Sequence, residues 1–407
     1  MKVSIIGAGY VGLVSGVCLA EKGHEVVCVD NDILKVNKIN LSISPIYEDG
    51  LDELLLKNIE NRFSASVDLT NAVINSDVSL LAVGTPFDGN EIDLKYVRQV
   101  AKEIGIALKE KNEYHVVVVK STVVPGTTDK VVIPILEKYS GKKSGVDFGV
   151  GMNPEFLREG SAIYDFMNPD RIVLGAIDSK THRLLSELYF PFSDVSCLKT
   201  NNKTAEMIKY TSNSFLATLI SFSNEVGNLC SSIGEIDSLE VMEGVILDKR
   251  ISTILDNGDR IVPSITSYLE AGCGFGGSCL PKDVKALIKH GERHDQSMLL
   301  LKSVVEINYK QPFEIIDTLK KYYPDFNGLK ISVLGLAFKP GTDDMRESPA
   351  IPIINKLQEG GAVIRAYDPV AEEEAKLIFK GFNIRYCSSI NSVLNEAQVI
   401  LLLTRWP

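Results

Sequence analysis

The chain has neither a positive charge excess nor a long apolar run. Its 407 residues carry 43 basic and 53 acidic side chains, which gives a formal net charge of -10. Such a surface on average repels nucleic acid and anionic lipid. Apolar runs such as Met298–Leu301 and Val399–Leu403 fall far short of the roughly 20 residues that cross a bilayer. We therefore expect no nucleic-acid partner and no membrane association.

A signal peptide and a disulfide framework are also missing. The N-terminus runs from Met1 to Ile6 straight into a glycine turn, without the apolar stretch and cleavage site of a leader. The cysteines are odd in number and scattered, which is typical of reduced proteins (Cys18, Cys28, Cys197, Cys230, Cys273, Cys279 and Cys387). We therefore expect a cytoplasmic protein. Its length suffices for two or three domains, each with its own core.

Short β-rich runs alternate with helical stretches in the first part of the chain, which predicts a βαβ pattern with buried parallel strands. The spacing of apolar residues from Asn201 to Gly234 predicts one long helix, and Asp256–Gly277 is expected to be an irregular loop. Lys330–Leu336 begins a second α/β unit. Such a unit would usually continue beyond the strand Gln398–Leu403, so we expect the chain to be cut short. The expected strands of the first unit are Val3–Ile6, Glu25–Val29, Val78–Val83 and Val116–Val119.

The motif Gly7-Ala8-Gly9-Tyr10-Val11-Gly12 follows the first predicted strand and opens a helix, and Asp30 ends the next strand. These are the parts of a dinucleotide fingerprint: a tight turn, a close approach to pyrophosphate, helix packing and an acceptor for ribose hydroxyls. The acid favours NAD over NADP, although Lys35 nearby weakens that preference. The alternative is a glycine turn without a ligand.

A second glycine-rich segment runs from Gly272 to Asp283 and contains Cys279 just before a predicted helix, near Lys282. A cysteine in such a place is favoured as a thiolate and is a candidate nucleophile. The alternatives are a packed thiol, or a disulfide or metal pair with Cys273. We expect no metal, because His290 and His294 lie at a probable helix end without a second cysteine pair.

Further polar residues fall at positions where ligands gather. Lys209 and Asn213 share one helix face, as do Glu155 and Glu159, and Thr85 and Thr122 follow two predicted strands. The alternatives are a solvated helix face and ordinary turn or N-cap chemistry. In the second unit, the loop with Phe338, Lys339 and Arg346 could meet a base and phosphates, or be a basic surface loop.

The ordered set of motifs resembles the nucleotide-sugar dehydrogenase family over essentially the whole chain. The set comprises the fingerprint with Asp30, Lys120-Ser121-Thr122-Val123, Asn153-Pro154-Glu155-Phe156-Leu157, Ala205-Glu206 through Lys209 to Asn213, Gly274-Phe275-Gly276-Gly277-Ser278-Cys279 with Lys282-Asp283, and Phe338-Lys339-Pro340 with Arg346-Glu347-Ser348.

The resemblance implies an α/β fold with two Rossmann-like doubly wound domains joined by a long central helix that forms a homodimer core. The implied domains are residues 1–200 for NAD, 201–312 for the helical linker with the cysteine loop, and 313–407 for the sugar nucleotide. The implied reaction is the NAD-dependent, four-electron oxidation of UDP-glucose to UDP-glucuronate through a thiohemiacetal and a thioester on Cys279.

The resemblance also implies residue roles. Lys209 and Asn213 would stabilise an oxyanion, Asp283 and Thr122 would hold water, and Glu155 would assist acid-base or thioester steps. Implied cofactor contacts are Gly7, Gly9, Tyr10, Val11, Gly12, Asp30, Lys35, Thr85, Thr122, Glu159 and Arg346. Implied substrate contacts are Glu155, Phe156, Leu157, Lys209, Asn213, Arg250 or Arg260, Tyr268, Leu269, Gly274, Phe275, Gly276, Phe338 and Lys339.

Three alternatives stay open at this point. The same chemistry could act on GDP-mannose or a UDP-N-acetylhexosamine. A two-electron hydroxyacid dehydrogenase would need a lysine and an asparagine but no nucleophilic thiol. An inactive NAD-binding module would need neither.

Overall fold

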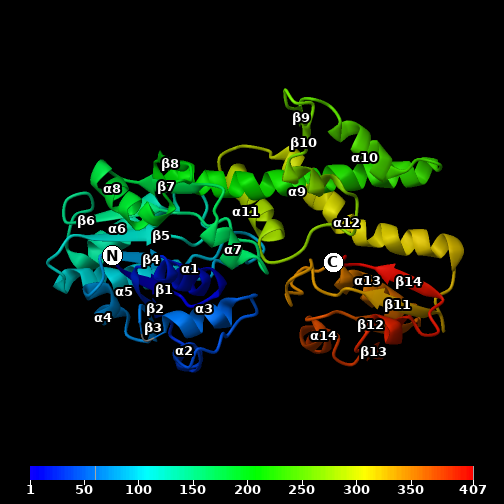
Figure 1. Cartoon of the computed structure of the whole chain (residues 1–407), viewed down its shortest axis with the longest axis horizontal. Coiled ribbons are helices and arrows are strands. Elements are labelled where there is room, and N and C mark those ends of the chain that lie inside the picture. Colours follow the sequence, from blue (N-terminus) through cyan, green and yellow to red (C-terminus); the bar gives the residue numbers. More distant parts are fainter. Residues whose placement is uncertain (60, 407) are drawn as a thin grey trace. The chain divides into compact units, whose positions relative to one another are not determined.

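A computed structural model describes residues 1–59 and 61–406, and the chain divides into two compact units, Met1–Thr211 and Ser212–Pro407 (Figure 1). Within the described residues, no helix is long and apolar enough to cross a membrane. The first unit is built on a mostly parallel sheet and the second on a smaller parallel sheet.

The first unit contains an eight-stranded sheet in the order β3-β2-β1-β4-β5-β6-β7-β8, in which only β6 and β7 pair antiparallel. The order β3-β2-β1-β4 reverses at β1, which is the switch point where Rossmann-like sheets bind dinucleotides. The strands are β1 (Lys2–Ile6), β2 (Glu25–Val29), β3 (Phe63–Ser66), β4 (Val78–Leu81), β5 (His115–Val119), β6 (Phe148–Met152), β7 (Ile172–Ala176) and β8 (Cys197–Thr200).

The central strand β5 shows why this sheet forms. Its sequence His-Val-Val-Val-Val is buried at every position, and continuous β-branched runs are typical of strands covered on both faces. The covering elements are the helices α1 (Tyr10–Glu21), α2 (Ile33–Asn40), α3 (Leu51–Asn58), α4 (Leu69–Ile74), α5 (Lys95–Glu110), α6 (Ile133–Ser140), α7 (Ala162–Met167) and α8 (Ser179–Leu188), the π-helical turn η1 (Thr128–Val132) and the 3-10 turn η2 (Phe190–Phe192).

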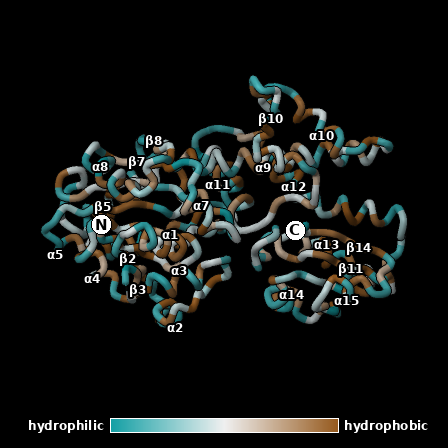
Figure 2. Tube along the Cα trace, viewed as in Figure 1, coloured by the Kyte–Doolittle hydropathy of each residue, from teal (hydrophilic) through white to brown (hydrophobic). Residues whose placement is uncertain are grey.

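A single helix, α9 (Asn202–Ile233), runs from the first unit into the second, as the apolar spacing predicted. In the second unit, a four-stranded parallel sheet has the order β13-β12-β11-β14, and Figure 2 shows hydrophobic residues along β11 and β14. These strands are β11 (Lys330–Leu334), β12 (Val363–Tyr367), β13 (Ile384–Tyr386) and β14 (Val399–Leu402). The predicted fold class, with two Rossmann-like sheets and a long helix between them in sequence, is confirmed.

The remaining elements of the second unit lie between α9 and β11 or around the four-stranded sheet. The expectation of an irregular loop over Asp256–Gly277 was wrong in part, because this segment contributes strand β10 to a short hairpin and then forms the 3-10 turn η3. These elements are α10 (Ser238–Ile246), β9 (Thr253–Ile254), β10 (Arg260–Ile261), η3 (Ser264–Leu269), α11 (Leu280–Glu292), α12 (Leu299–Tyr322), α13 (Ala350–Glu359), α14 (Glu372–Ile378) and α15 (Ile390–Leu394).

Candidate active site

The turn between β1 and α1 has the backbone that its glycines predict. Gly7 has a φ of +109°, and a Cβ on Gly12 would lie 1.8 Å from the carbonyl oxygen of Gly7. By contrast, nothing lies within 4 Å of a Cβ built on Gly9. The space beside Gly9 lies at the amino end of α1, where backbone amides and the helix dipole favour a pyrophosphate. The residues present therefore fit a dinucleotide.

Asp30 directly follows β2, and its hydrogen bonds hold the turn between β1 and α1 in place. Its Oδ2 accepts hydrogen bonds from the backbone amide of Ala8 (2.9 Å) and from Lys35 Nζ (3.1 Å), and Oδ1 accepts from the Asp32 amide (3.1 Å). Burial would raise the pKa of Asp30, but these donors outweigh it and lower the pKa overall. A carboxylate kept ionised is suited to accept from ribose hydroxyls, as predicted.

Two predicted hydroxyl residues meet where the neighbouring strands β4 and β5 end. The Thr85 hydroxyl donates to the carbonyl oxygen of Thr122 (2.7 Å). Since β4 and β5 are parallel, their carboxyl ends lie at the same sheet edge as the nucleotide turn. This hydrogen bond therefore fixes Thr122 at the ligand-binding edge of the sheet.

A buried ion pair joins the two strongest acid-base candidates of the first unit. Lys209 Nζ lies 2.7 Å from Glu155 Oε1, and the two side chains are only 4% and 6% exposed. The other carboxylate oxygen of Glu155 accepts from the Leu157 amide (2.7 Å). Burial would raise the pKa of Glu155, whereas Lys209 and the Leu157 amide lower it, with a net decrease. Two cations lie near the ring of Phe156: the Arg171 guanidinium is 3.9 Å and the Lys209 ammonium 5.6 Å from the ring centre.

One contributor to this region escaped the sequence reasoning. Glu48 is buried, accepts from the Tyr10 hydroxyl, and accepts from the amides of Gly160 and Ala162 at 2.7 Å each. It thus connects the nucleotide turn to the segment that follows Glu159. No local pattern around Glu48 marks this role, because its partners at positions 160 and 162 lie far away in the sequence.

In the second unit, Cys279 occupies the N-cap position of α11 and is exposed. The Asp283 amide donates to the Cys279 carbonyl oxygen (2.9 Å), which places the Asp283 carboxylate one turn along the helix. That carboxylate is 1% exposed and accepts from Asn213 Nδ2 and Lys282 Nζ, both at 2.6 Å. Four of the residues singled out in the sequence therefore meet at the start of one helix.

The glycine-rich loop before Cys279 packs against the loop that follows β11. A Cβ on Gly277, which has a φ of +80°, would lie 2.7 Å from the ring of Phe338, and one on Gly276 would lie 2.4 Å from the carbonyl oxygen of Glu347. The Gly277 amide donates to the Arg346 carbonyl oxygen (2.8 Å). The loop needs glycine at these positions because backbone and an aromatic ring approach so closely.

Amides from α9 and α12 support the same loop and were not predicted from the sequence. Asn308 bonds to both the amide (2.7 Å) and the carbonyl oxygen (2.9 Å) of Phe275. Asn224 Oδ1 accepts from the Gly272 amide (2.7 Å), and Gln311 donates to the Gly272 carbonyl oxygen (2.8 Å). These hydrogen bonds hold the loop to α9 and α12, in addition to its contacts with Phe338.

Two predicted arginines are held within their own segment. Arg250 pairs with Asp248 (2.5 Å), and Arg260 donates to the Leu247 carbonyl oxygen (2.8 Å) and to Ser252 Oγ (2.6 Å). The hairpin of β9 and β10 keeps Arg260 there. The structure therefore leaves the choice between Arg250 and Arg260 as a substrate contact open.

The predicted residues are divided between the units. The first unit contains Gly7, Gly9, Tyr10, Val11, Gly12, Asp30, Lys35, Thr85, Thr122, Glu155, Phe156, Leu157, Glu159 and Lys209, and the second contains Asn213, Arg250, Arg260, Tyr268, Leu269, Gly274, Phe275, Gly276, Cys279, Asp283, Phe338, Lys339 and Arg346. Lys209 and Asn213 lie one turn apart on α9.

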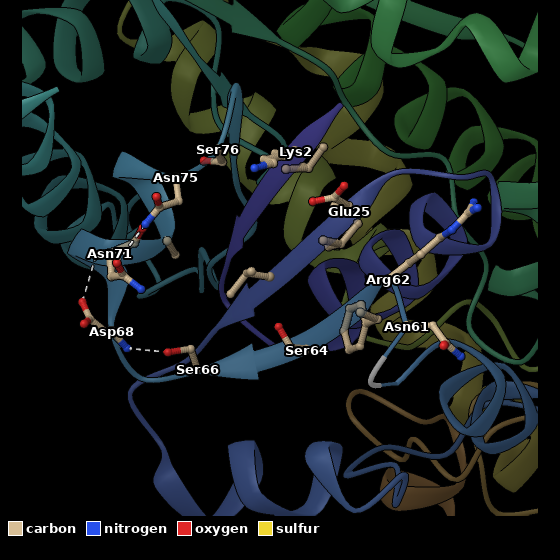
Figure 3. A pocket seen from close by; sticks show the side chains of 15 residues that line it. Lys2, Glu25, Asn61, Arg62, Ser64, Ser66, Asp68, Asn71, Asn75 and Ser76 are labelled. Carbon is tan, nitrogen blue, oxygen red and sulfur yellow. Dashed lines mark hydrogen bonds between the residues drawn. The ribbon is translucent and has the colours of Figure 1, made fainter. Parts of the chain in front are cut away.

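A cavity of about 500 Å³ lies elsewhere on the first sheet, along β3 and α4 and at the starts of β1 and β2 (Figure 3). The side chains labelled in Figure 3 are polar. Along one wall, the backbone amide of Asn71 donates to the Asp68 carboxylate, and the backbone amide of Asp68 donates to Ser66 Oγ. None of the predicted site residues lines it. The candidate site is therefore the ligand-binding edge of the sheet and not this cavity.

The Rossmann-like sheet with its glycine turn and acid, together with a lysine and an acid in a buried pair, defines a dinucleotide-dependent oxidoreductase. Comparison with known proteins gives the family. Three models of the UDP-glucose/GDP-mannose dehydrogenase family match: its NAD binding domain over residues 1–193, its central domain over 203–310 and its UDP binding domain over 332–407. The chain belongs to this family and is an NAD-dependent nucleotide-sugar 6-dehydrogenase.

Individual relatives match nine tenths or more of this chain. UDP-glucose 6-dehydrogenase TuaD of Bacillus subtilis is 44% identical, covering 100% of this chain and 84% of the relative. GDP-mannose 6-dehydrogenase of Pseudomonas aeruginosa is 43% identical, covering 90% and 81%. The structure of a UDP-glucose dehydrogenase from Pyrobaculum islandicum is similar with a TM-score of 0.91 and 39% identity, covering 100% of this chain and 90% of that one.

Proposed function

We propose that this enzyme oxidises UDP-glucose to UDP-glucuronate in two steps, with Cys279 as the covalent nucleophile. The observation that carries the proposal is the exposed Cys279 at the amino end of α11, one turn from Asp283. A helix N-terminus favours the thiolate over the thiol. The two relatives named for UDP-glucose support the substrate.

The proposed reaction oxidises the C6 alcohol in two steps and ends with hydrolysis of a thioester. The C6 alcohol loses a hydride and a proton to give an aldehyde, and the Cys279 thiolate adds to its carbonyl carbon to form a thiohemiacetal. Loss of a second hydride and proton gives a thioester, and water then breaks the carbon–sulfur bond and releases the carboxylate. NAD, when bound, supplies the hydride acceptor for both oxidations. A thiohemiacetal keeps the aldehyde bound and presents a hydride for the second step.

Roles for the other side chains follow from their chemistry. Lys209, ion-paired with Glu155, would stabilise the developing oxyanion with Asn213, while Asp283 and Thr122 would hold the hydrolytic water. Glu155 would accept protons during the acid-base and thioester steps. The remaining cofactor and substrate contacts stay predictions, as do the domain boundaries at residues 200 and 312.

The test is the NADH produced per limiting nucleotide sugar by the wild type, Cys279→Ser and Cys273→Ser. We expect two NADH per UDP-glucose, a loss of full turnover in Cys279→Ser, and near-normal turnover in Cys273→Ser, a half-buried cysteine of the same loop. Full turnover by Cys279→Ser, or one NADH per substrate, would refute the covalent mechanism.

GDP-mannose is the second candidate substrate, because the Pseudomonas relative that carries its name is nearly as similar as the Bacillus one. The same assay decides between them. A kcat/KM for GDP-mannose that exceeds the value for UDP-glucose would replace the substrate in the proposal and leave the cysteine chemistry intact.

We also propose a homodimer through α9. Its second half presents apolar residues at alternating intervals of four and three, which is the heptad spacing of packed helices. Phe215, Phe222, Leu229 and Ile233 are each at least half exposed, and Leu219 and Val226 continue the row. An exposed apolar seam of this kind is best covered by a second copy of the same helix.

Light scattering after gel filtration tests the dimer. We expect about twice the chain mass for the wild type and the monomer mass for Phe222→Glu. Leu34→Glu, an equally conspicuous exposed leucine on α2, is the control and should leave the mass unchanged. A monomeric wild type at micromolar concentration contradicts the dimer.

The cytoplasm is the compartment that we propose. None of the seven cysteines, all within the described residues, forms a disulfide, as expected under reducing conditions.

A further inference from the structure

A second buried lysine lies in the same cluster as the Glu155–Lys209 pair. Lys120 directly follows β5, is 3% exposed, and donates from Nζ to Asn153 Oδ1 (2.9 Å). Asn153 follows β6 and stands two residues before Glu155. The cluster therefore holds two buried lysines and one buried carboxylate.

The orientation of Asn153 is fixed, so this contact is specific. Its Nδ2 donates to the Val173 carbonyl oxygen (3.0 Å), which leaves Oδ1 as the acceptor for Lys120 and also for the Tyr189 hydroxyl. The ring of Phe166 lies 5.8 Å from the Lys120 ammonium. Lys120 is thus held by neutral groups, and the opposite charge that acts on it, Glu155, is the one that pairs with Lys209.

The charges in the cluster do not cancel. Burial lowers the pKa of Lys120 to about 8; Glu155 works against this decrease and Lys209 adds to it. Lys120 in turn contributes to the lowered pKa of Glu155. Arg171, whose guanidinium lies 3.9 Å from the centre of the Phe156 ring, is a further cation near this region. Removing the Lys120 charge should therefore change the protonation of the pair, most directly that of Glu155.

We propose that Lys120 is a positioning residue of the active site, whose buried ammonium sets the charge state of the Glu155–Lys209 pair and thereby the pH range of turnover. The proposal rests on the proposed function for the roles of Lys209 and Glu155. Lys120 acts only through these neighbours, because its own hydrogen bond goes to Asn153.

A second buried lysine of the first unit provides a matched control. Lys111 is 5% exposed and donates to the carbonyl oxygens of Ile74 (2.6 Å) and Ser76 (2.9 Å). Burial also lowers its pKa. Its partners are backbone groups and it contacts none of the predicted site residues in these hydrogen bonds, so Lys111→Met measures the general cost of losing a buried lysine.

The experiment compares the pH dependence of kcat for the full-length wild type, Lys120→Met, Lys120→Arg and Lys111→Met. The Lys120 charge is present below about pH 8, and removing it makes protonation of Glu155 easier. The acid limb of the Lys120→Met profile should therefore move up by about one pH unit. Lys120→Arg keeps the charge and should return the profile toward that of the wild type. Lys111→Met should leave it in place.

A lower kcat for Lys120→Met with an unchanged acid limb would show a purely structural role and overturn the proposal. A second measurement does not need activity: the titration of the Glu155 carboxyl by NMR, with glutamate labelled at its δ-carbon and Glu155→Gln used for assignment. It should move to higher pH in Lys120→Met, and an unmoved titration overturns the proposal. If the wild type turns over no nucleotide sugar, the proposed function fails while this titration still decides the role of Lys120.

Discussion

The first unit should lose stability in mild acid through one histidine that takes no part in the proposed reaction. His115 begins β5 and is fully buried. Its Nδ1 lies 3.0 Å from the Ser76 carbonyl oxygen and must donate to it, so Nε2 accepts from the Ser79 hydroxyl (2.8 Å). The Ser79 oxygen then accepts from Ser4 (2.6 Å). Protonating Nε2 would reverse this row of hydroxyl hydrogen bonds and place a positive charge inside the sheet, which is costly.

The magnitude follows from the pKa. Burial, with the nearby Lys111 charge, lowers the pKa of His115 from 6.5 to about 3. As the pH falls, the unfolded chain takes up a proton near pH 6.5 while the native chain does not, so stability present above pH 6.5 is lost. The loss approaches about 1.4 kcal/mol per pH unit, and amounts to about 2 kcal/mol between pH 7 and pH 5.

Urea unfolding at pH 7 and pH 5 measures this loss. Hydrogen-exchange mass spectrometry of the peptide that contains β5 is the readout of unfolding. The sole tryptophan, Trp406, belongs to the second unit and would not report on β5. The glutamine of His115→Gln retains a donor and an acceptor but does not titrate. Between pH 7 and pH 5 the free energy of unfolding of this variant should therefore fall by about 2 kcal/mol less than that of the wild type. His294→Gln, at an exposed position, should behave like the wild type. Equal losses in the wild type and His115→Gln would refute the reasoning.

Two further predictions concern backbone at the site. Gly12→Ala should destabilise the first unit and abolish NAD binding, because its Cβ would lie 1.8 Å from the Gly7 carbonyl oxygen. Gly9→Ala should keep the melting temperature and weaken only NAD binding, because nothing lies within 4 Å of its Cβ. Calorimetry measures both quantities, and equal melting temperatures for the two variants would contradict this prediction. Asn308→Ala removes both hydrogen bonds to Phe275 and should cost about 1–3 kcal/mol locally. We expect faster hydrogen exchange in the cysteine loop and a lower kcat, and unchanged exchange there would be the contrary result.

The parts of the site that the sequence predicted are those whose geometry is local. The turn from Gly7 to Gly12 needs glycines for reasons set within six residues, and Cys279 and Asp283 are placed together by one helical turn. Glu48 and Asn308 could not be found in this way, because each acts on backbone far away in the sequence: Glu48 holds Gly160, which is 112 positions further along.

One error had a usable signal. The segment expected to be an irregular loop contains Asn257-Gly258, a pair typical of hairpin turns, and Gly258 has the positive φ that such turns require. The two strands that it joins pair over only two residues each, Thr253–Ile254 and Arg260–Ile261, and alternation over so few positions cannot be recognised. Turn chemistry was therefore more informative here than strand propensity.

The two buried lysines of the first unit show what sequence patterns cannot distinguish. Lys111 and Lys120 stand four residues before and directly after the same strand, and burial lowers the pKa of each. Lys111 donates to two backbone carbonyl oxygens, and these groups do not gain or lose a proton themselves. Lys120 lies beside the Glu155–Lys209 pair, whose protonation depends on every neighbouring charge. A buried cation gains a functional consequence only where its neighbours can themselves gain or lose a proton.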